Sequence, residues 1–143
     1  MYQKIIVVGN LGGDPEMRYM PDGTAVTNFS VATNRSWNDR QTGQRVDETT
    51  WFRVSVWGKR AEVANQYLGK GSKVLVEGRL RPDSNTGGPR TYTRQDGTVG
   101  ASFDIHADNF SFVGGRDEAS SFEGGGGDPG AGGPVQEEDD IPF

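Results

Sequence analysis

The centre of the chain is the stretch Thr49-Thr50-Trp51-Phe52-Arg53-Val54-Ser55-Val56-Trp57. Its alternation predicts a β-strand with two unlike faces. One face has the composition of a core: Phe52, Val54 and Val56. The opposite face presents two indoles, a guanidinium and a hydroxyl in one direction, from Trp51, Trp57, Arg53 and Ser55. Flat rings interleaved with positive charge suit unpaired nucleic-acid bases on a phosphate chain. A strand buried on both faces, with its tryptophans filling a core or an interface, fits the same periodicity.

The charged residues divide the 143-residue sequence into two segments of different composition. Residues 1–113 carry 14 basic and 12 acidic side chains, whereas residues 114–143 carry one Arg against eight acids. The overall net charge of −5 therefore describes the tail, and the first 113 residues remain compatible with a polyanionic ligand.

Several classes of protein are excluded or disfavoured by composition. There is no cysteine, which excludes disulfides, thiolate metal sites and a cysteine nucleophile. No apolar run approaches the roughly 18 residues of a membrane span. The first residues, 1–4, lead directly into a strand pattern without a signal-peptide pattern, so we expect a soluble intracellular protein.

Other strands flank the central one. Residues 5–8 are apolar on both faces, which predicts either a subunit interface or a central strand under a loop. Strands are also predicted over 25–33, 73–81, 91–95 and 101–113, with a short strand at 17–20 and a bulge or bend near Asn109. Residues 34–47 are polar and read as a long hairpin loop, and residues 82–89 as a Gly/Asn/Ser/Pro loop.

One helix is predicted, over Lys59–Leu68, where apolar residues recur at a period near 3.6 and Gly69 is placed to end it. Five strands with one helix between the third and fourth, in about 110 residues, point to a small β-barrel. The predicted fold class is all-β, a five-stranded OB-fold barrel, followed by a disordered C-terminal tail.

Three segments follow from this division. Residues 1–113 form the OB-fold domain, residues 114–134 a Gly-rich flexible linker, and residues 135–143 an acidic tip. The tip ends in two acids and an apolar triplet that includes the terminal carboxylate: Asp139, Asp140, Ile141, Pro142 and Phe143.

The chain resembles the bacterial single-stranded DNA-binding (SSB) family. The resemblance covers Lys4 to Val113 and the extreme C-terminus, in stretches that are individually weak but stand in order at matching spacing. They include Val8-Gly9-Asn10-Leu11-Gly12, Asp14-Pro15-Glu16, Ser36-Trp37, Thr50-Trp51-Phe52-Arg53-Val54, Trp57-Gly58-Lys59, Ala61-Glu62-Val63-Ala64, Val76-Glu77-Gly78 and Asp139-Asp140-Ile141-Pro142-Phe143.

The resemblance implies a homotetramer that wraps single-stranded DNA without sequence preference, in the bacterial cytoplasm and associated with the nucleoid. Carried over to this chain, the base-stacking positions are Trp37, Trp51, Trp57 and Tyr92. The phosphate-binding positions are Lys4, Arg18, Arg40, Arg53, Lys59, Lys70 and Arg81. The extended loop 82–89 departs from the family pattern next to Tyr92, where the family often has Trp.

The resemblance also implies that the acidic tip recruits replication, recombination and repair proteins. An extended acidic segment can place Phe143 in an apolar hole of a partner, with its carboxylate against Arg or Lys. A tail that only improves solubility is the alternative.

No catalytic residue, cofactor, metal or membrane association is expected. Asp104, His106 and Asp108 share a strand face at i, i+2 and i+4, but sites with a single histidine are rare and we interpret these residues as structural. Two further functions stay open: an OB domain that binds RNA or assists translation, and a protein-interaction module whose rings fill an interface.

Overall fold

The computed structural model describes residues 1–114, and the predicted linker and tip lie outside them. It contains seven strands and one helix in this order: β1 Ile5–Leu11, β2 Glu16–Tyr19, β3 Ala25–Asn38, β4 Arg45–Trp57, α1 Lys59–Tyr67, β5 Lys73–Leu80, β6 Arg90–Thr93 and β7 Val99–Phe112. None of the described residues forms a helix long and apolar enough to cross a membrane.

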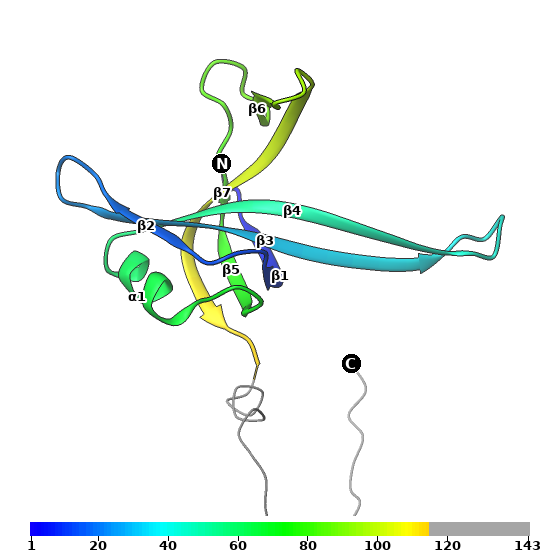
Figure 1. Ribbon diagram of the computed structural model, residues 1–143, viewed down its shortest axis with the longest axis horizontal. Coiled ribbons are helices and arrows are strands. Elements are labelled where there is room, and N and C mark those ends of the chain that lie inside the picture. The colour runs from blue at the N-terminus through cyan, green and yellow to red at the C-terminus, as the bar shows by residue number, and fades with distance from the viewer. Residues whose placement is uncertain (115–143) are drawn as a thin grey trace, which may run out of the picture.

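Five of the strands close a barrel. The sheet runs β1-β5-β7-β4-β3, and β1 pairs again with β3, which returns the sheet to its start. Strands β4 and β7 are parallel, and the other pairs are antiparallel. Strand β2 extends the sheet from β3, and β6 forms a hairpin with β7 (Figure 1). In chain order, α1 follows the third barrel strand, β4, and precedes the fourth, β5. The predicted OB-fold class is confirmed.

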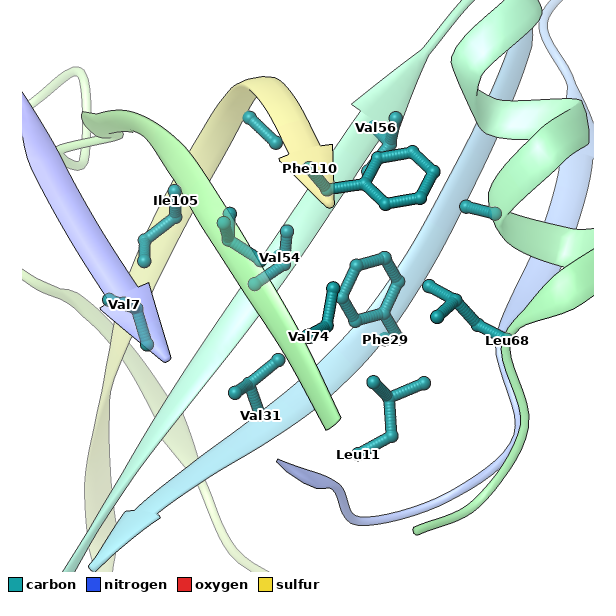
Figure 2. Packing of buried hydrophobic residues seen from close by; sticks show 13 residues of the cluster. Val7, Leu11, Phe29, Val31, Val54, Val56, Leu68, Val74, Ile105 and Phe110 are labelled. Carbon is teal, nitrogen blue, oxygen red and sulfur yellow. The ribbon is translucent and has the colours of Figure 1, made fainter. Parts of the chain in front are cut away.

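The inward faces of these strands build one core. Val54 and Val56 of β4 are almost completely buried, as their alternation predicts. They pack with residues of the other barrel strands and of the end of α1 (Figure 2), namely Val7, Leu11, Phe29, Val31, Ala64, Leu68, Val74, Val76, Ile105, Ala107 and Phe110. Phe52 is only partly buried, and Leu80, Phe103 and Phe112 are exposed.

One buried hydroxyl ties the helix to the barrel. Thr27 is fully buried in β3, and its Oγ1 donates to the Ala61 carbonyl of α1 at 2.6 Å. Because a buried hydroxyl without a partner is costly, this bond fixes how the helix sits on the sheet.

The bend predicted near Asn109 is present. Glu77 of β5 pairs with Asn109, but Gly78 pairs with Ala107, so Asp108 is an extra residue in β7. A Cβ at Gly78 would collide with the carbonyl of His106, which explains the glycine opposite the irregularity.

The prediction of a long loop over residues 34–47 is wrong. Strands β3 and β4 stay paired as far as Asn38 opposite Arg45, so they project from the barrel as a two-stranded arm that is clear in Figure 1. Only residues 39–44 form the turn. Most residues of the arm are exposed and, apart from Trp37 and Val46, they are polar, so the arm lacks the regular alternation of apolar and polar residues that marks a half-buried strand.

The apolar strand at residues 5–8 has one exposed face. Ile6 and Val8 of β1 are 60% and 48% exposed, and within residues 1–114 no loop covers them. The prediction of a central strand under a loop is therefore wrong for the described residues, and the interface prediction stays open.

Candidate nucleic-acid interface

A groove of about 470 Å³ crosses the sheet on the outer face of β4. Trp51 and Arg53 line it from the central strand, and Tyr92 lines it from β6. The remaining lining comes from Phe52 of β4 and from the β1–β2 turn, β2, β3 and β7: Gly13, Asp14, Glu16, Asn28, Phe29, Ser30, Ala101 and Ser102. The structure thus brings together two predicted stacking residues and one predicted phosphate residue.

Trp51 is available to a ligand. Trp51 is 53% exposed and Tyr92 is 48% exposed, so neither residue is buried in the core. The alternative in which both faces of the central strand are buried is contradicted for Trp51 and Arg53.

Trp57 has a different environment at the other end of the same strand face. It is half-buried and stacks on His106, with ring centroids 6.2 Å apart and planes inclined by 22°. Its indole Nε1 is buried and has no hydrogen-bond partner among residues 1–114. Trp57 does not line the groove, so the structure separates it from Trp51.

Trp37 lies on the arm and faces away from Trp51. Trp51 pairs with Ala32, and Trp37 stands five residues beyond Ala32 on the same strand. Because side chains alternate along a strand, an odd separation places the two tryptophans on opposite faces of the β3–β4 ribbon. Trp37 is 38% exposed, and the guanidinium of Arg35 lies 5.1 Å from its ring centroid.

The predicted phosphate residues are dispersed. Arg53 is in the groove, and Arg18 of β2 stands in the row of Val26 and Trp57 on the same sheet face. Lys59 is exposed in the first turn of α1, and Arg40 is exposed in the turn of the arm. The backbone N–H of Lys70 donates to Asp14 Oδ1 at 2.9 Å, which holds the turn that carries Lys70 beside the groove.

Lys4 and Arg81 lie away from the groove. The Lys4 ammonium is 3.2 Å from the Glu77 carboxylate, and this hydrogen bond and charge raise the pKa of Lys4. Arg81 follows β5 and lines two smaller clefts beside loop 82–89.

Sequence reasoning missed three arginines beside predicted rings or near the groove. Arg35 lies over Trp37, and Arg94 has its guanidinium 5.7 Å from the centroid of Tyr92. Arg90 pairs loosely with Asp104, at 4.0 Å between Nη1 and Oδ2. Their signal was present: Arg35 with Trp37, and Arg90 with Tyr92 and Arg94, repeat the period-two alternation of ring and cation seen in the central strand.

The candidate metal residues have structural contacts. Asp104 accepts a hydrogen bond from Ser102 Oγ at 2.7 Å, and His106 stacks on Trp57. In the part of the chain that the structure describes, no three His, Asp or Glu side chains gather closely enough to hold a metal ion.

These observations define an OB-fold barrel with an open groove that carries both aromatic and cationic side chains. The family model described as the single-strand binding protein family matches residues 2–113. Proteins named single-stranded DNA-binding protein from Neisseria meningitidis serogroups A and B are 48% identical over 117 residues. The chain belongs to the single-strand binding protein family.

The aligned region is 82% of this chain and 63% of each Neisseria relative, so the chain spans less than two thirds of their length. The fold also matches a structure described as a Plasmodium falciparum SSB complex with ssDNA. That match has a TM-score of 0.63 and 26% identity, over 80% of this chain and 96% of the other.

Proposed function

We propose that this protein binds single-stranded DNA without sequence preference, through the groove that contains Trp51, Arg53 and Tyr92. The observation that carries the proposal is the half-exposed indole of Trp51 in a groove that also holds a cation and a second ring. The family match and the DNA-bound relative from Plasmodium falciparum support it.

The physical basis of selectivity is the exposed face of an unpaired base. Stacking on an aromatic side chain is worth about 1–3 kcal/mol per base and is nearly independent of sequence. Arg53 meets the phosphate chain and releases counterions, so affinity falls as salt rises. Duplex DNA keeps its base faces inside the stack, and rings on an open sheet gain little from it.

The direct experiment is a binding titration of the full-length chain with labelled 20-mers of dT, of mixed sequence and of duplex DNA, with oligo-rU as a fourth arm. We expect similar affinities for the two DNA single strands and much weaker binding of the duplex. Preferential binding of oligo-rU would favour the RNA-binding alternative, and no binding in any arm would favour the protein-interaction alternative.

A homotetramer is part of the proposal. Ile6 and Val8 form an exposed apolar strip on β1, next to the half-buried Leu75 that pairs with Val8. The Lys4–Glu77 ion pair borders this strip, which gives the apolar centre and polar rim of a protein interface. Several copies on one DNA strand raise the effective concentration of every later contact.

Light scattering on the full-length chain tests the assembly. The wild type should have the mass of four chains, and Ile6→Lys with Val8→Lys should lower that mass because two buried charges would replace apolar contacts. A variant that keeps the full mass would show that the strip is not an interface.

For the acidic tip, the proposal rests on sequence and on family resemblance. Residues 135–143 recruit replication, recombination and repair enzymes to DNA in the bacterial cytoplasm, through Ile141, Pro142 and Phe143 and the acids before them. Deleting residues 139–143 should abolish partner binding and leave DNA affinity equal or higher. A clear drop in DNA affinity would count against this role.

A further inference from the structure

Gly12 follows β1 directly, and its backbone does not require a glycine. Its φ lies outside the positive region, so an L-residue can adopt the same conformation. A Cβ at this position would instead collide with the indole of Trp51, at 2.7 Å from Cη2 and closer still to Cζ3. The side chain of Trp51, not the local backbone, therefore excludes a methyl group here.

The contact shows how the indole is held. Trp51 belongs to β4, and Gly12 adjoins the end of β1, with β3 between them in the sheet. The ring reaches across β3 and along it by two residues, because Trp51 pairs with Ala32 whereas Gly12 N donates a hydrogen bond to the Ser30 carbonyl at 3.1 Å. Because Gly12 has no side chain, the ring can approach the backbone there closely, while about half of the Trp51 residue stays exposed.

The second groove ring has the same support. Gly100 of β7 pairs with Tyr92 of β6 and is also outside the positive-φ region. A Cβ at Gly100 would lie 2.7 Å from Tyr92 Cζ, 2.9 Å from its Oη and 3.0 Å from Arg94 Nη2. At Gly9 and Gly78, in contrast, a Cβ would collide with backbone carbonyls of the neighbouring strand. Strand pairing, not an aromatic ring, requires glycine at those two positions.

We propose that Gly12 and Gly100 are positioning residues that seat Trp51 and Tyr92 against the sheet and thereby hold both rings ready to stack on bases. The inference rests on the proposed function of the groove. A methyl group at either position would push its ring out of place. The backbone could remain unchanged, so affinity for single strands should fall more than stability does.

The test uses the full-length chain with Gly12→Ala, titrated with labelled oligo-dT. We expect binding at least about fivefold weaker, which corresponds to the low end of one lost base stack. The matched control is Gly69→Ala, because Gly69 also has an ordinary φ and a Cβ there would make only a 3.7 Å contact with Asp14. This control should bind as the wild type does.

A double-mutant cycle separates seating from any other effect of the methyl group. In a Trp51→Ala background, Gly12→Ala should cost no further affinity, because the ring that it displaces is absent. Gly100→Ala with Tyr92→Ala gives a second, independent cycle that remains informative if Gly12→Ala fails to fold. Wild-type affinity in both glycine variants, or a loss that persists without the ring, would overturn the inference.

A spectroscopic readout distinguishes failure of the inference from failure of the proposed function. With Trp37→Phe and Trp57→Phe, Trp51 is the sole tryptophan, and Gly12→Ala should change its emission and its quenching by iodide. If the wild type does not bind oligo-dT, the proposed function fails, and this signal still reports whether Gly12 seats the ring. Unchanged emission and quenching would overturn the seating itself.

Discussion

Truncation of the two tryptophans of the central strand should affect different properties, DNA affinity in one case and stability in the other. Trp51 is 53% exposed and lines the groove, so Trp51→Ala removes a stacking surface but little of the core. One lost stack of about 1–3 kcal/mol corresponds to a fall in oligo-dT affinity of about 5- to 150-fold. The free energy of unfolding should change by no more than about 1 kcal/mol, because an exposed ring contributes little packing.

Truncation of Trp57 should lower stability more than it lowers DNA affinity. It is half-buried against His106 and lies outside the groove, so Trp57→Ala should lower the free energy of unfolding by about 3 kcal/mol, near the low end for a large aromatic side chain. Its buried Nε1 has no hydrogen-bond partner in the described part of the chain, so Trp57→Phe removes an unsatisfied N–H and keeps a ring in place. The free energy of unfolding of Trp57→Phe should lie within about 1 kcal/mol of the wild-type value or be higher than it.

Both quantities can be measured on the same preparations. Urea denaturation at one fixed protein concentration gives the unfolding free energies, since assembly makes stability depend on concentration. Anisotropy of labelled oligo-dT gives the affinities. A larger loss of affinity in Trp57→Ala than in Trp51→Ala, or a lower free energy of unfolding in Trp51→Ala than in Trp57→Ala, would refute these two roles.

Three further outcomes follow from single contacts. Thr27→Val should lower the free energy of unfolding in urea by about 1–2 kcal/mol, because it removes the buried hydrogen bond to Ala61, and Thr27→Ser, which keeps the hydroxyl, should retain that bond. Arg53→Gln should reduce the slope of log affinity against log salt by about 0.7, and an unchanged slope would remove Arg53 from the phosphate contacts. The hydroxyl of Thr98 lowers the pKa of Asp96, so the turn's contribution to stability is present above the ordinary value of 3.8 and is lost as pH falls through the lower folded-state pKa. The stability difference between wild type and Asp96→Asn should therefore shrink in acid, and a difference that persists below that pKa would contradict this assignment.

Much of the fold could be predicted from local patterns. The alternation around Val54 identifies the central strand and its core face, and the near-3.6 period after Trp57 identifies the one helix, which ends one residue earlier than predicted, at Tyr67. The change in apolar phase near Asn109 identifies the irregularity in β7, because an extra residue reverses which positions face inward. The arm over residues 34–47 was not predicted, because a two-stranded ribbon with solvent on both faces lacks a regular alternation of apolar and polar residues.

The site could be predicted only in part, because its geometry depends on contacts between strands. Period two places Trp51 and Trp57 on one strand face, but it does not show that His106 covers one of them. The opposite orientation of Trp37 follows from the register of β3 against β4, and the pairing of Lys4 follows from its nearness to Glu77 on β5. None of these relations is local in sequence.

The most direct measurement is a titration of the full-length chain with oligo-dT, followed by its intrinsic tryptophan fluorescence. If the groove accepts unpaired bases on Trp51, emission should be strongly quenched, high salt should restore it, and duplex DNA of the same length should leave it unchanged. A flat titration with oligo-dT, or equal quenching by the duplex, would contradict the account.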